Sequence, residues 1–236
     1  MTLSGLSVTW LGHGTFILTS PGGRRILVDP WLEGNPACPA ELKNPGKVDL
    51  ILVTHGHFDH VSDAAAVAKA SGAVVVGIFE LCHWLESRKG VTRTSGMNKG
   101  GTQEQCGIRI TMVDAKHSSS FIDDGVLTYL GEPAGYVLRF ENNLCVYFAG
   151  DTALFGDMAL ICELYAPTIA FLPIGDFFTM DPQAAAKAVE LLGVRTVIPM
   201  HYGTFPILTG RPDVLREFVA PLGVDVVDIA PGQTVA

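Results

Sequence analysis

The sequence predicts an α/β domain in which two mixed β-sheets are flanked by helices. Short β-type runs alternate with Ala-rich helical runs, the second half repeats the order of the first, and no low-complexity linker separates them. The 236 residues are 48% hydrophobic and only 17% charged, so the chain can bury a large core without a disulfide or metal staple. We therefore expect residues 1–236 to form a single domain.

The first half is predicted to begin with an antiparallel meander. Three β-type runs follow one another closely, at 6–11, 15–19 and 25–29, and Pro21-Gly22-Gly23 supplies a turn. Residues 31–47 lack periodicity and predict a surface loop. The remaining expected elements are strands at 48–54, 73–77 and 108–115, a helix at 63–71 that Ser62 caps and Gly72 ends, and a helix at 80–89.

The second half is predicted to open with a hairpin and to continue with alternating helices and strands. Asn142-Asn143 separates β-type runs at 136–141 and 144–149, and Asp181-Pro182 begins a helix that extends to Leu192. Residues 116–134 form a loop longer than a simple connection needs. The other expected elements are a helix near 157–164, strands at 168–172, 195–199 and 224–229, and a helix at 212–220.

Charge and hydropathy argue against several classes of partner. The chain carries 16 basic and 24 acidic residues, a net charge of −8, with no Lys/Arg cluster longer than a pair, which argues against nucleic acid. Apolar runs are shorter than the roughly 20 residues of a spanning helix, which argues against a membrane role. The five scattered cysteines and the lack of an N-terminal signal pattern predict reduced thiols and a cytoplasmic location.

The segment Thr54-His55-Gly56-His57-Phe58-Asp59-His60 carries the strongest chemical signal. It follows a predicted strand and precedes a predicted helix, so its side chains gather at the end of a strand. Three imidazoles and a carboxylate are metal ligands, and four of them so close together cannot all bind one small ion without strain. The spacing therefore indicates two neighbouring metal ions.

Further ligands are expected from the ends of other strands. His117, Asp151 and His201 each follow an apolar β-type run, where layered α/β folds place their sites. Each of these residues taken alone would more often be a capping or solvated side chain. Together with the His-rich segment they complete two coordination shells.

These motifs resemble those of the metallo-β-lactamase-fold hydrolase superfamily, and within it the bacterial metal-dependent hydrolases related to ascorbate-phosphate lactonase. The resemblance spans nearly the whole chain and implies a four-layer αββα sandwich with the site along one edge of the two sheets. The segments that carry it are WLGHGTF at 10–16, VDP at 28–30, HGHFDH at 55–60, GEPAGY at 131–136, AGDT at 149–152, LPIGDFFTMDP at 172–182 and IPMHYGTFP at 198–206.

The resemblance also implies which residues hold the metals. His55, His57 and His117 would bind one ion, Asp59, His60 and His201 the other, and Asp151 would bridge them. We expect two divalent ions, with zinc favoured and manganese, iron and nickel left open, and the lack of Cys ligands argues against a closed structural zinc site. Two such ions can hold a bridging hydroxide as the nucleophile.

Three residues are expected to assist catalysis. Asp59 would also accept a hydrogen bond from the nucleophile, and Tyr202 would polarise a substrate oxygen, the alternative being a packed aromatic ring. His13 would orient a ligand or touch substrate, and the alternative is a strand-end histidine bonded to the backbone. Residues 118–120 and 178–180 are expected to line the pocket, with ordinary loop packing as the alternative.

The leading hypothesis is therefore a cytoplasmic dinuclear metal hydrolase that acts on a small anionic lactone, ester or phosphodiester. The alternative is a non-catalytic metal- or ligand-binding protein, such as a sensor, on the same fold. The lack of a signal pattern argues against a secreted β-lactamase, and His57 stands where flavodiiron oxygen reductases have Glu. The low charge content is compatible with a homo-oligomer. Two bound ions would create a positive cleft in an acidic protein, where a small anion could bind.

Overall fold

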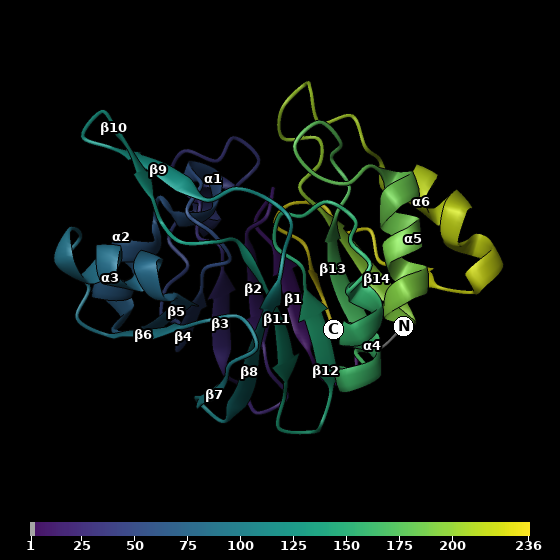
Figure 1. The fold of residues 1–236 in the computed structure, drawn as a ribbon, viewed down its shortest axis with the longest axis horizontal. Coiled ribbons are helices and arrows are strands. Elements are labelled where there is room, and N and C mark those ends of the chain that lie inside the picture. The colour runs from purple at the N-terminus through teal and green to yellow at the C-terminus, as the bar shows by residue number, and fades with distance from the viewer. Residues whose placement is uncertain (1–2) are drawn as a thin grey trace.

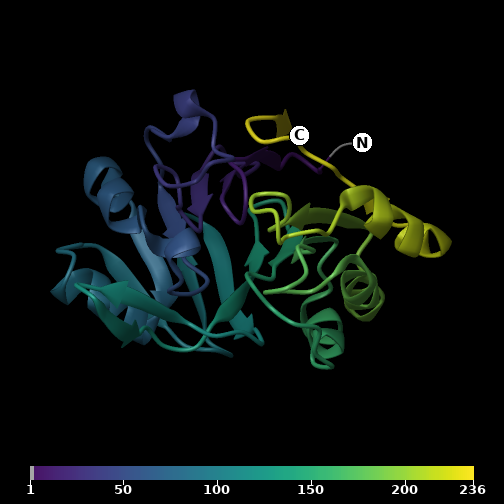
Figure 2. The same ribbon diagram turned by 90° about the horizontal axis from the view of Figure 1, so that it is seen from above.

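A computed structural model describes residues 3–236, and this part of the chain forms two seven-stranded sheets and a separate two-stranded ribbon. The two sheets pack against each other in the middle of the molecule (Figure 1). Helices α2 (Ala64–Ser71) and α3 (Phe79–Ser87) lie outside the first sheet, and helices α4 (Met158–Tyr165), α5 (Pro182–Leu192) and α6 (Pro212–Val219) lie outside the second (Figure 2). This is the predicted αββα arrangement.

The first sheet begins as an antiparallel meander and continues with parallel strands. Its strand order is β16-β1-β2-β3-β4-β5-β6. The strands are β1 (Ser7–Trp10), β2 (Phe16–Thr19), β3 (Arg25–Val28), β4 (Leu50–Leu52), β5 (Val74–Ile78), β6 (Thr94–Met97) and β16 (Thr234–Val235). Because β1 and β3 are both antiparallel to β2, and β3 is parallel to β4, the strands β1, β3 and β4 all run in one direction.

The second sheet combines a hairpin with a parallel half. Its order is β15-β14-β13-β12-β11-β8-β7. The strands are β7 (Thr102–Gln105), β8 (Ile108–Asp114), β11 (Ala134–Arg139), β12 (Cys145–Phe148), β13 (Ile169–Pro173), β14 (Thr196–Met200) and β15 (Asp225–Val226). Both β8 and β12 are antiparallel to β11, so they run in the same direction as each other and as β13 and β14.

A continuous apolar core joins the two sheets. Strands β4 and β12 are buried along their whole length, as expected for strands covered on both faces. Hydrogen bonds also connect the sheets at the edge where β4 ends. The hydroxyl of Tyr136 donates to the carbonyl of Val53 at 2.7 Å, and the amide of Ala134 donates to the carbonyl of Thr54 at 3.0 Å. These bonds fix the segment that enters the His-rich motif.

Most predicted elements are confirmed, including the meander, the hairpin over Asn142-Asn143 and the helix that begins at Pro182. The carboxylate of Asp181 caps that helix by accepting from the amide of Ala184 at 2.7 Å. No helix within residues 3–236 has both the length and the apolar character to cross a membrane.

Two local expectations are wrong. The segment 116–134 is not a plain loop, because β9 (Ser120–Asp123) and β10 (Val126–Tyr129) form the antiparallel ribbon within it. Ser62 does not cap α2, since a short helix, α1 (Phe58–Val61), precedes it and the Ser62 hydroxyl donates to the carbonyl of Phe58. The sequence analysis also did not predict β6, β7, β16 or the short 3₁₀ helices Ala40–Leu42 and Ala220–Leu222.

Candidate metal centre

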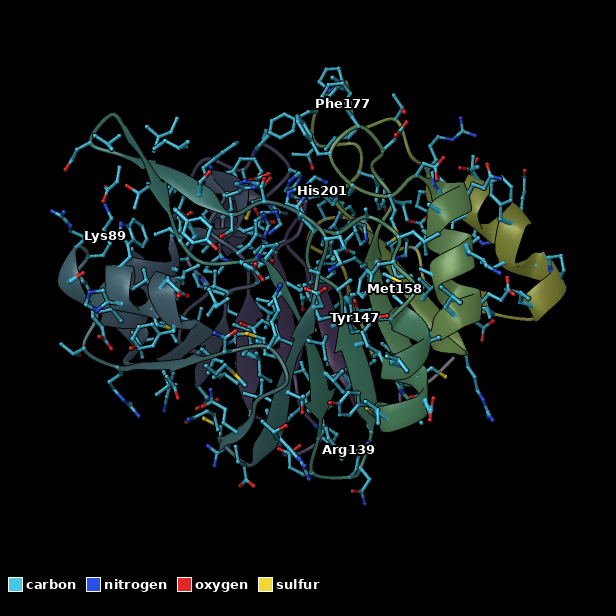
Figure 3. All side chains as sticks on the ribbon, in the orientation of Figure 1. Lys89, Arg139, Tyr147, Met158, Phe177 and His201 are labelled. Atoms are coloured by element: carbon cyan, nitrogen blue, oxygen red, sulfur yellow. The ribbon has the colours of Figure 1, made fainter. Side chains whose placement is uncertain are left out.

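All predicted metal ligands meet at one edge of the two sheets. His55 follows β4, His117 follows β8, Asp151 follows β12 and His201 follows β14, and each lies beyond the carboxyl end of its strand. Helix α1 then brings Asp59 and His60 back over the end of β4. We call the seven residues the ligand cluster: His55, His57, Asp59, His60, His117, Asp151 and His201. Figure 3 shows His201 below the loops that cover this edge.

The ligand cluster divides into two sets. In the first set, ligand atoms of His55, His57 and His117 all lie within 4.8 Å of one another, and Nε2 of His55 lies 3.0 Å from Nδ1 of His57. In the second set, ligand atoms of Asp59, His60 and His201, together with one of His13, also lie within 4.8 Å of one another. Asp29, His55 and His60 form a third such group, and the ring centroids of His55 and His60 lie 4.1 Å apart, so the two sets adjoin each other. Which of these residues would bind which ion stays a prediction.

Asp151 lies between the two sets. Its Oδ2 atom is 2.9 Å from Nε2 of His201 and 3.4 Å from Nε2 of His60 in the second set. The same oxygen is 3.6 Å from Nε2 of His117 and 3.9 Å from Nε2 of His55 in the first. A single carboxylate thus faces ligands of both sets.

The cluster fits metal ions by its donor chemistry and by its unpaired atoms. Nε2 of His60 and Oδ1 of Asp151 are buried and have no hydrogen-bond partner among residues 3–236. Buried polar atoms without a partner are rare and cost free energy unless a ligand satisfies them. Imidazole nitrogens and carboxylate oxygens suit zinc, manganese, iron and nickel, so the cluster is chemically able to bind such ions.

The electrostatics of the cluster favour a cation. Burial lowers the pKa of His55, His57 and His117, so these imidazoles are neutral near pH 7 and have lone pairs available. Although burial opposes it, the carboxylates of Asp151, Asp29 and Asp59 raise the pKa of His60 well above its usual value. Positive charge is therefore stabilised where His60 meets these carboxylates.

Asp29 supports the cluster from behind, a role that the sequence analysis did not assign. Its Oδ2 atom accepts a hydrogen bond from Nδ1 of His60 at 2.8 Å and another from the Thr54 hydroxyl at 2.7 Å, while Oδ1 accepts from the Thr54 amide at 2.7 Å. A carboxylate that binds one ring nitrogen fixes the tautomer and leaves the other nitrogen free to bind metal. The sequence feature that could have identified Asp29 is the VDP motif at the end of β3, where a polar residue follows an apolar strand.

Three residues at the site have left-handed backbone conformations without being glycine. The φ angles are 58° at His13, 48° at Asp29 and 57° at His201. Such conformations cost of order 1–3 kcal/mol and persist where the surrounding structure holds them. At His201 the amide donates to the carbonyl of His13 at 3.1 Å, so the turns of these two residues support each other.

The other two proposed catalytic residues lie in different places. Nε2 of His13 lies 2.9 Å from Oδ2 of Asp59, and burial lowers the pKa of His13 to about 4. The hydroxyl of Tyr202 instead donates to Asp228 at 3.1 Å, and its ring packs on Trp10 in a separate cavity. The turn at His201 directs the two neighbouring side chains to different cavities, and this geometry favours the alternative of a packed aromatic ring for Tyr202.

A cavity of about 550 Å³ opens over the ligand cluster. Of the two segments expected to line it, Ser118 and Phe178 do so, whereas Ser119 is buried and its hydroxyl accepts from the Gly56 amide at 3.0 Å. Met180 is also buried in the core rather than exposed to the cavity. The cavity lining is His13, His57, Phe58, Asp59, His117, Ser118, Asp151, Phe178, His201, Phe205 and Ile207.

Proteins of similar sequence and structure are named as metal-dependent hydrolases. The beta-lactamase superfamily domain family matches residues 24–202. A "UPF0173 metal-dependent hydrolase" from Roseiflexus castenholzii is 51% identical over 98% of this chain and 97% of its own, and one from Koribacter versatilis is 52% identical over 99% of both. The solved structure of Igni18, described as a novel metallo hydrolase from Ignicoccus hospitalis, is 35% identical with a TM-score of 0.84, over 98% of this chain and 97% of its own. The chain therefore belongs to the metallo-β-lactamase superfamily and is a metal-dependent hydrolase.

Proposed function

We propose that the protein hydrolyses a small-molecule lactone, ester or phosphodiester at a pair of divalent metal ions, for which we favour zinc. The observation that carries this proposal is the position of Asp151, whose Oδ2 atom faces ligands of both sets. When bound, two such ions can generate a hydroxide near neutral pH and stabilise negative charge that develops on the substrate. The residues around them would hold the ions, orient the nucleophile and the substrate, and transfer protons.

Asp59 is placed to act on the nucleophile. Burial opposes ionisation of Asp59, but His60 and the hydrogen bond from His13 lower its pKa below the usual range, so it is a carboxylate at neutral pH. It lines the cavity and can therefore accept a hydrogen bond from the nucleophile there. His13 contacts Oδ2 of this carboxylate through Nε2 and holds it in place, which makes His13 a positioning residue.

The test combines metal analysis with turnover. Metal-loaded wild type is assayed on a panel of lactones, carboxylic esters and phosphodiesters, with anionic and uncharged members of each class, beside Asp59→Ala and a control, Asp157→Asn. Asp157 is exposed and lies outside the cluster. We expect the wild type and the control to hydrolyse at least one class, and Asp59→Ala to lose about 10²-fold or more in kcat/KM.

A non-catalytic sensor or binding protein on the same fold makes the opposite prediction. In that case Asp59→Ala would keep its metal and its folding and would match the wild type in every assay. A wild-type protein that holds two ions per chain and hydrolyses no member of the panel would contradict the proposed function.

A further inference from the structure

The cavity over the ligand cluster has a polar base and an apolar opening. The opening is formed by four side chains, which we call the apolar rim: Phe58, Phe178, Phe205 and Ile207. They come from three separate segments, namely α1 and the loops that follow β13 and β14. Within residues 3–236, no Lys or Arg side chain lines this cavity.

The apolar rim is unusually exposed for side chains of its type. Phe58 is 53% exposed, Phe178 is 54% exposed and Ile207 is 42% exposed. Single exposed apolar residues are normal on protein surfaces, but several around one opening mark a binding site. In the ligand-free protein, water covers this apolar surface, and an apolar group that displaces the water would be stabilised.

The two loops that carry most of the apolar rim are fixed to each other. A Cβ atom on Gly175 would lie 2.0 Å from the carbonyl oxygen of His201, and one on Gly210 would lie 1.6 Å from that of Ile174. The backbones therefore touch at positions where only glycine fits. Within the first loop, the amide of Asp176 donates to the carbonyl of Met180 at 3.0 Å, which closes the turn that presents Phe178. The apolar rim is thus largely formed before a ligand binds, which limits the entropic cost of binding.

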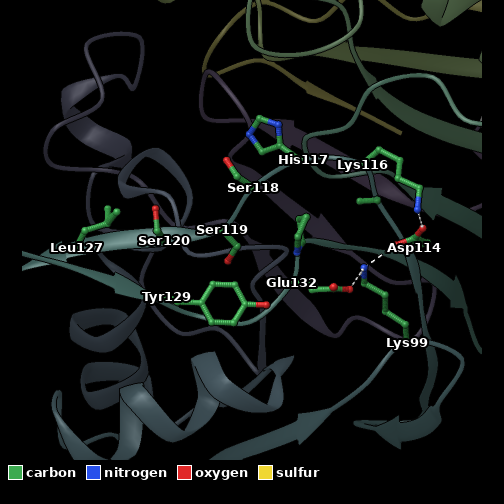
Figure 4. A pocket seen from close by; sticks show the side chains of 12 residues that line it. Lys99, Asp114, Lys116, His117, Ser118, Ser119, Ser120, Leu127, Tyr129 and Glu132 are labelled. Carbon is green, nitrogen blue, oxygen red and sulfur yellow. Dashed lines mark hydrogen bonds and ion pairs between the residues drawn. The ribbon is translucent and has the colours of Figure 1, made fainter.

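Two lysine side chains, Lys99 and Lys116, line a second cavity that adjoins the first. Figure 4 shows this cavity of about 530 Å³, which shares only His117 and Ser118 with the first. Nζ of Lys99 lies 2.5 Å from Asp114 and 2.8 Å from Glu132, and Lys116 also pairs with Asp114. Carboxylates therefore already neutralise both lysines, and neither side chain lines the cavity over the ligand cluster.

We propose that the apolar rim binds an uncharged apolar group of the substrate, of the size of a phenyl ring or a short branched alkyl chain. This proposal rests on the proposed function, because the apolar group belongs to the molecule that is hydrolysed. A carboxylate at the apolar rim would lose its hydration without a Lys or Arg side chain there to pair with it. This lining favours an uncharged group over the anionic substrate that the sequence predicts.

Three hydroxamic acids with the same metal-binding group separate the contribution of the cavity wall from that of the metals. Acetohydroxamic acid has only a methyl group, phenylacetohydroxamic acid adds a phenyl ring, and succinic monohydroxamic acid adds a carboxylate. Calorimetric titration of the metal-loaded protein should show the phenyl compound binding about tenfold tighter than the methyl compound, because its ring buries apolar surface. The carboxylated compound should bind no tighter than the methyl compound.

Matched variants locate the effect. Phe178→Ala should reduce the phenyl preference to about threefold or less. Lys116→Ala, in the second cavity, and Phe218→Ala, which removes a 46% exposed phenylalanine of α6, should leave it unchanged. Equal or undetectable binding of all three acids would overturn the proposal. The proposal would also be overturned if the carboxylated compound bound most tightly and Lys116→Ala abolished that preference.

The binding assay and the hydrolysis assay fail independently. If no member of the substrate panel is hydrolysed but the phenyl preference and its dependence on Phe178 persist, the proposed function is wrong and the assignment of the apolar rim stands. If esters are hydrolysed but the carboxylated hydroxamate binds best, the proposed function stands and the assignment of the apolar rim is wrong.

Discussion

The ligand cluster and the apolar rim border the same cavity but are built in opposite ways. The cluster lies at the carboxyl ends of strands, and His55, His60 and His201 are at most 1% exposed. The rim lies mainly on loops, and three of its four side chains are more than 40% exposed. Buried residues that are held by hydrogen bonds tolerate few substitutions, whereas loop residues tolerate many. On the two proposals above, the cluster would determine the reaction and the rim would determine which molecule undergoes it.

Removing Asp151 should have the largest effect, because its Oδ2 atom lies within 3.9 Å of two Nε2 atoms in each set of ligands. We expect Asp151→Ala to lower the metal content below two ions per chain and kcat/KM by about 10³-fold. Elemental analysis after dialysis and steady-state kinetics on the best substrate of the panel measure the two effects. If the variant kept both ions and most of its activity, Asp151 would not be the shared ligand.

Removing Asp29 should show how much the cluster depends on a residue that supports a metal ligand without binding the metal itself. Asp29→Ala leaves buried Nδ1 of His60 and the Thr54 donors without their acceptor. We expect a loss of about 3 kcal/mol in the free energy of unfolding and a 10–100-fold weaker metal affinity. Urea denaturation and competition with a chelator measure these quantities. A variant with unchanged metal affinity would show that His60 needs no support from Asp29.

Replacing His13 tests whether it acts on the metals or on Asp59. In the structure it contacts Asp59 directly, so His13→Ala should keep the metal content and lower kcat about tenfold with little change in KM. His13→Gln, which can still donate to the carboxylate, should recover part of the loss. Loss of one metal ion in His13→Ala would instead identify His13 as a ligand.

Tyr202→Phe should have the smallest effect, because the Tyr202 hydroxyl points to Asp228 in another cavity. We expect kcat/KM to stay within about twofold of the wild type and the free energy of unfolding to change by no more than about 1 kcal/mol. A hundredfold loss of activity would restore Tyr202 to the reaction and contradict the structural comparison.

The sequence is informative about the cluster for a physical reason. Polar residues that end apolar strands must gather at a sheet edge in a layered fold, so the positions of His117, Asp151 and His201 follow from the order of strands and polar residues along the chain. The same rule applied to Asp29, which ends β3, would have predicted its role. Its importance depends on the pairing of β3 with β4, which places it beside Thr54.

The rim and its surroundings could not be derived in the same way. Phe178 and Ile207 lie in loops, where no periodicity indicates which side chains face a cavity. In the ribbon β9–β10, Ile122 and Leu127 pair on one face and are 68% and 70% exposed, while Phe121 on the other face packs against Trp84. Apolar residues therefore lie on both faces, and the sequence lacks the alternation of buried and polar residues that identifies a strand. The direction of Tyr202 depends on the left-handed φ of its neighbour His201.

The proposed function requires that the seven side chains of the ligand cluster hold two metal ions joined by Asp151. Electron paramagnetic resonance of the chelator-treated protein reloaded with Mn²⁺ tests it most directly, because two manganese ions about 3.5–4 Å apart are magnetically coupled. We predict two ions per chain with a coupled spectrum in the wild type, and an uncoupled spectrum in Asp151→Ala. A single ion per chain, or two ions without coupling in the wild type, would contradict the account.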